Sequence, residues 1–285
     1  MIKRTVIYVL YGIMGLAFVY LFSQIFVFAS FKIPSDSMHP ELKQGDHILV
    51  VKPIYGARLF DVFATLSLKQ VEIYRTPGFR NVQRNDVVVF NNPYPILGNG
   101  MCMHILKYYV KRCVGIPGDS LFISDYHYLR KGDNQIYGNV AIQNLLRDFL
   151  NLNLKMKGFA AFPFDSLMQW NIKDFGPMYI PAKGDSMNMD RANYLLYKQL
   201  IEWETGKRLS FKDSRVCLGG SECKGYRFQK NYYFMAGDNI INSNDSRYWG
   251  LVPEEYIVGK VCLIWRSIDP VTGKYNWERC VKLVN

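Results

Sequence analysis

The chain has 285 residues, of which 49% are hydrophobic and 21% charged, a globular composition that excludes a disordered or collagen-like protein. Lys and Arg outnumber Asp and Glu by 35 to 24, and the net charge of +11 favours an anionic partner, either nucleic acid or a membrane surface. The cysteines form no Cys-x-x-Cys and the histidines no His-Glu-x-x-His, so we expect no metal site.

The first strong feature is an uncharged run over residues 5–31, which lies between the pair Lys3-Arg4 and Lys32. At ~1.5 Å per residue a helix of this length spans about 40 Å, enough to cross a bilayer core of about 30 Å. A cleaved signal peptide is the alternative, but its apolar core is usually shorter. The sequence therefore predicts one transmembrane helix over 5–31, with residues 1–4 in the cytoplasm and the remainder outside it.

Short β-branched and aromatic runs, several of them followed by Gly-Asp turns, recur through the exported part. This pattern predicts a mainly β, antiparallel fold. The predicted strands are Ile48–Val51, Val87–Phe90, Tyr108–Val114, Tyr232–Ala236 and Ile257–Trp265.

The sequence changes character between these strands, over residues 121–230. Asp190 begins a predicted helix that runs to Glu204 and is followed by Gly206, and a second helix is expected over residues 139–153. We interpret 121–230 as an inserted second domain of mixed α and β structure. The β core then consists of residues 32–120 and 231–285.

Two residues stand out as candidates for catalysis. Ser37 lies just beyond the predicted membrane span, although a serine in such a place is more often a simple turn residue. Lys111 has Val110, Cys113 and Val114 as neighbours, and apolar surroundings lower the pKa of a lysine because burial penalises its charged form. A neutral lysine of this kind can act as a general base on a serine hydroxyl.

Four segments together resemble the motifs of bacterial type I signal peptidases, which are serine–lysine peptidases. They occur in the family's order behind an N-terminal anchor and cover about a quarter of the chain. The family's fold is an antiparallel β-sheet catalytic core, and its reaction uses no cofactor. The segments are Ser35–Leu42, Arg84–Phe90, Tyr109–Asp119 and Gly237–Gly250.

The resemblance assigns roles to individual residues. Ser37 matches the nucleophile and Lys111 the general base, while the Ser35 hydroxyl and the Ser37 backbone N–H match the oxyanion hole. Ser243 matches the hydroxyl that orients the lysine. The matching supporting residues are Asp245 and Arg247 as an ion pair, Asp238 in a turn, and Arg112.

The chain also departs from the family pattern at several positions. Asp36 and Asn85 stand where glycine is common, Glu41 replaces a threonine, and Ile240-Ile241 replaces a more polar pair. None of these is a proposed catalytic residue. Asp36 would place a negative charge beside the oxyanion site, so we expect its carboxylate to point away.

The resemblance implies a membrane-bound serine endopeptidase that cleaves signal peptides from exported preproteins, on the outer or periplasmic face of the cytoplasmic membrane. Its partners would be preprotein signal peptides and membrane lipid, with no nucleic acid, metal or cofactor. The substrate would add as an extended strand beside Val87–Phe90 or Tyr108–Cys113. A self-cleaving repressor-type protease and a non-enzymatic binding protein are the alternatives; the membrane span opposes the first, and intact Ser37, Lys111 and Ser243 oppose the second.

Three further features concern residues outside the motifs. Ser186-Met187 repeats the Ser-Met pair but is interpreted as a turn that leads to the helix at Asp190. Cys217 and Cys223 could form a hairpin disulfide in an exported protein, and the sequence leaves this open. The apolar segment Tyr55–Leu66 is either a lipid-facing surface or a core strand.

Overall fold

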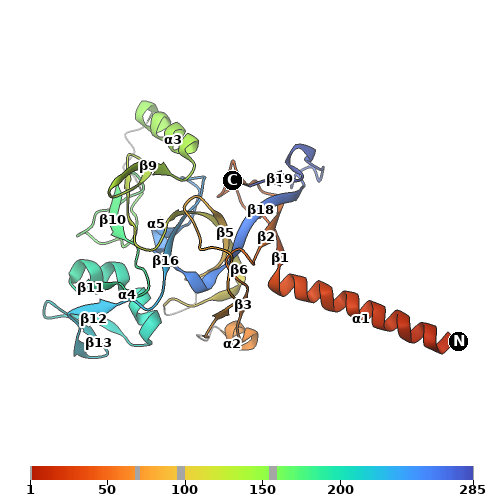
Figure 1. Ribbon diagram of the computed structural model, residues 1–285. Coiled ribbons are helices and arrows are strands. Elements are labelled where there is room, and N and C mark those ends of the chain that lie inside the picture. The colour runs from red at the N-terminus through yellow and green to blue at the C-terminus, as the bar shows by residue number, and fades with distance from the viewer. Residues whose placement is uncertain (1, 68–70, 95–99, 154–158, 285) are drawn as a thin grey trace.

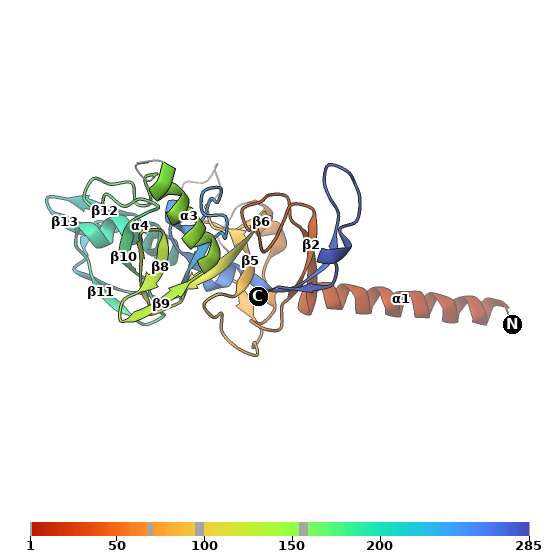
Figure 2. The ribbon, with the colours of Figure 1, turned by 90° about the horizontal axis from the view of Figure 1, so that it is seen from above.

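The computed structural model describes residues 2–67, 71–94, 100–153 and 159–284. A long helix, α1 (Ile2–Phe26), projects from one end of a β-rich body and carries the N-terminus at its far tip (Figures 1 and 2). Within the described residues, Ile7–Phe26 is the one stretch of helix long and apolar enough to cross a membrane. Its side chains lie outside the body of the protein, and its length matches a hydrocarbon core of about 30 Å.

The predicted helix over 5–31 is wrong at its C-terminal end. α1 stops at Phe26, and residues Phe28–Lys32 form strand β1 instead. β1 pairs antiparallel with β2 (Asp46–Val51), with Phe28 opposite Val51 and Lys32 opposite His47. Pairing with β2 replaces the helical hydrogen bonds, and the aromatic residues of this segment suit a pleated strand.

The central feature of the body is an eight-stranded antiparallel sheet, which confirms the predicted fold class. Its strand order is β1-β2-β18-β5-β6-β16-β17, and β19 pairs with β18. Each predicted strand lies within one of these, and the longest, β6, begins four residues earlier than expected. The remaining bounds are β5 Val87–Asn92, β6 His104–Gly115, β16 Tyr232–Ala236, β17 Val252–Pro253, β18 Ile257–Ser267 and β19 Lys282–Leu283.

A second group of elements lies at the end of the body away from α1 (Figure 2). It contains a four-stranded sheet of order β10-β7-β8-β9, two small sheets and two helices. The rings of Phe175 and Phe234 lie 5.6 Å apart and join this group to β16 in one hydrophobic core. The strands are β7 Ser120–Ser124, β8 His127–Arg130, β9 Asp133–Tyr137, β10 Phe175–Tyr179, β11 Ser186–Asn188, β12 Leu209–Lys212, β13 Arg215–Leu218, β14 Ser221–Glu222 and β15 Gly225–Arg227.

Both helices predicted in this region are present. α4 (Arg191–Thr205) begins after Asp190, whose side chain accepts a hydrogen bond from a backbone N–H of the first turn. It ends at Gly206, which has the left-handed conformation that glycine adopts at little cost. α3 (Val140–Asn153) matches the helix expected over 139–153. The division into a β core and an inserted domain stays a prediction.

Short elements complete the fold near the base of α1. β3 (Arg58–Leu59) pairs with β4 (Tyr74–Arg75), and α2 (Val62–Leu66) follows β3 after its N-cap Asp61. Of the apolar segment Tyr55–Leu66, Tyr55 is buried, but Val62 is 47% and Phe63 84% exposed. The segment is therefore divided: its first residues, 55–57, are buried in the body, whereas Leu59 and residues 61–63 are exposed. The remaining elements are α5 Ser246–Trp249 and the 3-10 helices Glu254–Tyr256 and Trp277–Arg279.

Candidate active site

The loop that carries Ser37 is anchored by the core beneath it. Met38 and Leu42 are fully buried in a cluster of aliphatic side chains from β2, β5 and β18. The Ser37 carbonyl accepts a hydrogen bond of 3.1 Å from the backbone N–H of Asn239, which joins this loop to the segment after β16. An added Cβ on Gly237 would overlap both the Ser37 carbonyl and the Ser243 hydroxyl, so only glycine permits this close approach.

Lys111 lies on β6 and points at Ser37. Its Nζ is 2.6 Å from Ser37 Oγ, although 74 residues separate the two in the chain. The Lys111 side chain is only 3% exposed, and burial lowers its pKa from 10.5 to about 8. The nearby Asp245 raises this pKa and Arg247 lowers it, so the two ionic neighbours oppose one another. The site thus holds an amine that can lose its proton near neutral pH beside a serine hydroxyl.

The proposed oxyanion donors lie on the same loop. Ser35 Oγ is 3.5 Å from Ser37 Oγ, close enough for both hydroxyls to face one reacting group. Within the described part of the chain, no acceptor is recorded for the Ser37 N–H. A hydroxyl and a backbone N–H are therefore both available beside the candidate nucleophile, as stabilisation of a developing negative charge requires.

A buried ion pair lies behind the dyad. Arg247 donates through Nε and Nη2 to the two oxygens of Asp245, at 2.8 and 2.7 Å, and both side chains are fully buried. Burial favours a raised pKa for Asp245, but the arginine charge and the hydrogen bonds together lower it, so the carboxylate is ionised. Its Oδ2 also accepts from the Gly237 N–H at 2.9 Å and from the Ser243 hydroxyl at 2.7 Å.

The expected contact between Ser243 and Lys111 is not among the recorded hydrogen bonds of the described residues. The Ser243 hydroxyl donates its proton to Asp245. A serine oxygen that donates one hydrogen bond can still accept another. The proposed role of Ser243 in orienting the lysine therefore stays a prediction.

A second buried ion pair joins the strand of the candidate base to the loop after β16. Arg112 donates to both oxygens of Asp238 at 2.8 and 2.7 Å, and its Nη1 also donates to the Asn85 carbonyl. Both residues were predicted from the motifs as supporting residues, but their pairing was not. Because Arg112 directly follows Lys111, this bidentate pair fixes the end of β6 that presents the amine.

Asp36, the unusual acid between the two serines, points away from the reacting groups as expected. Its carboxylate accepts hydrogen bonds from the side chains of Asn242 at 2.8 Å and Asn239 at 3.4 Å. These two asparagines lie in the Gly237–Gly250 motif, but no role for them was predicted from the sequence. The unusual acid at one motif and the amides at another were the only signal of this contact.

Other sequence candidates lie outside this site. The interpretation of Ser186-Met187 as a turn is wrong: Ser186–Asn188 form strand β11, which pairs with β15 in the second group of elements. Cys217 and Cys223 are free thiols. Cys217 is opposite Glu222, and the Cys223 N–H bonds to the Val216 carbonyl, so the two cysteines lie on opposite faces of the β13–β14 ladder.

The two strands proposed to receive a substrate differ in their pairing. β5 lies between β18 and β6 and has paired neighbours on both sides. β6 pairs with β5 over 104–112, but β16 is paired only with its last residues, from Arg112 to Gly115. The segment His104–Lys111 therefore has one edge without a described strand partner. An extended peptide could add to this edge and reach Lys111.

Comparison with known proteins gives one consistent result. A family model described as "Signal peptidase, peptidase S26" matches residues 4–266. Proteins named signal peptidase I are similar over most of the chain. One from Buchnera aphidicola subsp. Baizongia pistaciae is 30% identical over 88% of this chain and 73% of that protein. The protein from Pseudomonas aeruginosa is 28% identical over 88% of this chain and 69% of that protein. The one from Helicobacter pylori is 27% identical over 91% of this chain and 86% of that protein.

Proposed function

Since the chain belongs to the peptidase S26 family of signal peptidases, and is thus a serine endopeptidase, we propose that it cleaves signal peptides from exported preproteins with a Ser37–Lys111 dyad. The observation that carries this proposal is the 2.6 Å approach of the buried Lys111 amine to Ser37 Oγ. Segments distant in the chain converge there, beside two oxyanion donors.

In this mechanism Lys111 begins as a neutral amine and takes the proton of the Ser37 hydroxyl. The Oγ atom attacks the carbonyl carbon of the residue before the cut, and the Ser37 N–H and Ser35 hydroxyl donate to the oxyanion. The lysine ammonium then gives its proton to the leaving amine, and the C–N bond breaks. Water, deprotonated by the same lysine, hydrolyses the ester and restores the serine.

The supporting residues act by holding this geometry. Asp245 binds Ser243, the Gly237 N–H and Arg247, which fixes the shape of the segment after β16. The Asn239 N–H joins this segment to the Ser37 carbonyl. The Arg112–Asp238 pair fixes the strand beside it. No cofactor or metal is required by these steps, since the nucleophile, base and oxyanion donors all belong to the chain.

We further propose that α1 anchors the enzyme as a single span in the cytoplasmic membrane, with the N-terminus inside and the catalytic body outside. The pair Lys3-Arg4 before the span supports this direction, because basic residues favour the cytoplasmic side. Protease added to the outer face of the cytoplasmic membrane should digest the body. Digestion from the cytoplasmic face alone would reverse the topology.

The decisive test is cleavage of a purified preprotein by the wild type and by Ser37→Ala, with Ser186→Ala as a matched serine control. We expect Ser37→Ala to fold and insert normally but to lose cleavage, and Ser186→Ala to keep it. Near-normal turnover by Ser37→Ala would refute the mechanism.

A further inference from the structure

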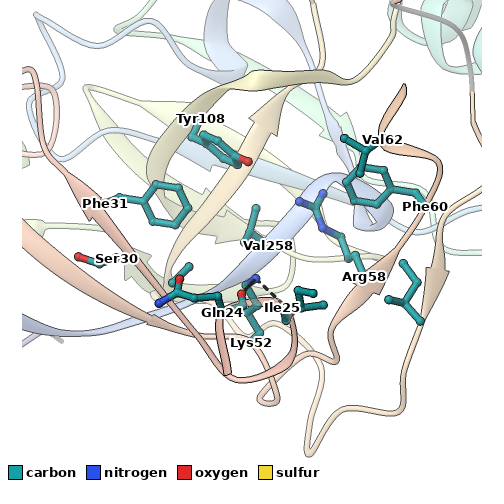
Figure 3. Close-up of a pocket in the computed structure, with 12 residues that line it drawn as sticks. Gln24, Ile25, Ser30, Phe31, Lys52, Arg58, Phe60, Val62, Tyr108 and Val258 are labelled. Carbon is teal, nitrogen blue, oxygen red and sulfur yellow. Dashed lines mark hydrogen bonds between the residues drawn. The ribbon is translucent and has the colours of Figure 1, made fainter. Parts of the chain in front are cut away.

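A groove of about 520 Å³ lies beside the end of α1, away from the dyad. Figure 3 shows Phe31 and Tyr108 on one side and Phe60 and Val62 on the other, with Lys52 and Val258 between them. The rim is open to solvent, since Leu59, Val62 and Tyr108 are 40 to 47% exposed. The groove therefore presents large apolar side chains from three separate segments of the chain, β1, β6 and the β3–α2 region.

The two cations in the groove are already engaged with the protein. Lys52 Nζ donates to the Gln24 and Ile25 carbonyls at 2.6 and 3.1 Å. Arg58 donates to the Asn91 side chain and to two backbone carbonyls of the 3-10 helix that precedes β18. Because these donors already have acceptors in the protein, the groove suits an apolar occupant better than a phosphate group.

The groove continues the edge of β6 that leads to the dyad. Tyr108 precedes Lys111 by three strand residues, about 10 Å at ~3.3 Å per residue. Its ring lies 4.8 Å from that of Phe31, which connects β6 with β1. A peptide extended along β6, with its scissile bond at Ser37, would place the fourth residue before the cut beside Tyr108. Residues further upstream would enter the groove.

We propose that this groove binds the apolar residues about five to seven positions before the cleavage site, and so selects signal peptides whose apolar core extends to that point. This inference rests on the proposed function. Position favours this occupant: Tyr108 of β6, on the edge without a described strand partner, lines the groove, and the last turn of α1 contributes Gln24 and Ile25 to its lining. A signal peptide that emerges from the bilayer beside α1 would reach the groove at the level of the last turn of α1.

The test compares two peptide substrates with the full-length chain in detergent micelles. One has Leu at the fifth to seventh positions before the cut, and the other has Ser there. For the wild type we expect kcat/KM to be about tenfold higher for the Leu peptide, mainly through KM, because burial of each leucine side chain favours binding. A ratio near one would overturn the proposal.

Two variants on α2 locate the effect. Val62 lines the groove, whereas its neighbour Phe63 is more exposed and does not. We expect Val62→Ser to reduce the Leu/Ser ratio at least threefold and Phe63→Ser to leave the ratio unchanged. Equal reductions of the Leu/Ser ratio in both variants would indicate adsorption to the micelle surface. An unchanged ratio in Val62→Ser would indicate that lipid or detergent fills the groove. Either result refutes the proposal. Loss of all cleavage in Ser37→Ala tests the proposed function separately.

Discussion

Lys111 gives the sharpest prediction, because its burial has one consequence for rate and another for stability. The reaction requires the neutral amine, and burial lowers the Lys111 pKa from 10.5 to about 8. At pH 7 about a tenth of the lysine is then neutral, compared with about 1 in 3000 for an ordinary lysine. The buried site therefore increases the reactive fraction about 300-fold.

The stability consequence has the opposite sign. The folded state holds the lysine proton less tightly than the unfolded chain, so this group contributes a penalty that is fully present below pH 8. The penalty is lost as the pH rises from about 8 to 10.5. The lowered pKa corresponds to about 3 kcal/mol. Lys111→Met, which keeps the stem and removes the charge, should therefore be inactive and more stable at pH 7, by up to about 3 kcal/mol.

Two measurements check this reasoning. We expect kcat/KM of the wild type to rise about tenfold per pH unit below pH 8 and to level off above it. Urea unfolding at pH 7 should give a higher midpoint for Lys111→Met than for the wild type, while Lys111→Arg should be inactive because a guanidinium stays protonated. An acidic limb near pH 5, or an active Lys111→Arg enzyme, would show that the lysine is not the base.

Three further outcomes follow from the geometry. Asp245→Asn removes a carboxylate that raises the Lys111 pKa and leaves the buried Arg247 without a charged partner. The acidic limb of the pH–activity profile should move to lower pH, and urea unfolding should show a loss of stability of about 3 kcal/mol. An unmoved limb would contradict the coupling. Cys217 and Cys223 should both react with a thiol reagent before any reductant is added, since the structure has them as free thiols; failure of both to react would indicate a disulfide. A chain that starts at Val27 should keep catalysis and float with liposomes. A chain that starts at Phe31 lacks most of β1 and should unfold at a lower urea concentration than the Val27 chain. Equal stability of the two chains would show that β1 contributes little to the stability of the fold.

Much of the fold was accessible from the sequence because it depends on local patterns. β-branched runs marked the strands of the central sheet, and Asp190 with Gly206 marked both ends of α4. The antiparallel class followed from short strands joined by tight turns. The end of α1 was not accessible in this way: an uncharged run is equally suited to a helix and to a strand, and the contact with β2 decides between them.

The candidate site shows the same division. The motifs identified Ser37 and Lys111, and the structure brings their side chains to 2.6 Å. The contacts of Asp36 and the partner of Arg112 join motifs more than 100 residues apart, and no local pattern encodes such a pairing. The disulfide was open for a related reason, because the spacing of two cysteines does not say which face of a hairpin each occupies.

Lys52 has a consequence for the behaviour of the whole enzyme in different membranes. Its bonds to the Gln24 and Ile25 carbonyls join the last turn of α1 firmly to the end of β2. With α1 in a bilayer, the hydrocarbon thickness influences the tilt of the helix, and this rigid connection passes the tilt on to the sheet. In such a bilayer we expect the height of the β-rich body above the lipid to vary with acyl-chain length.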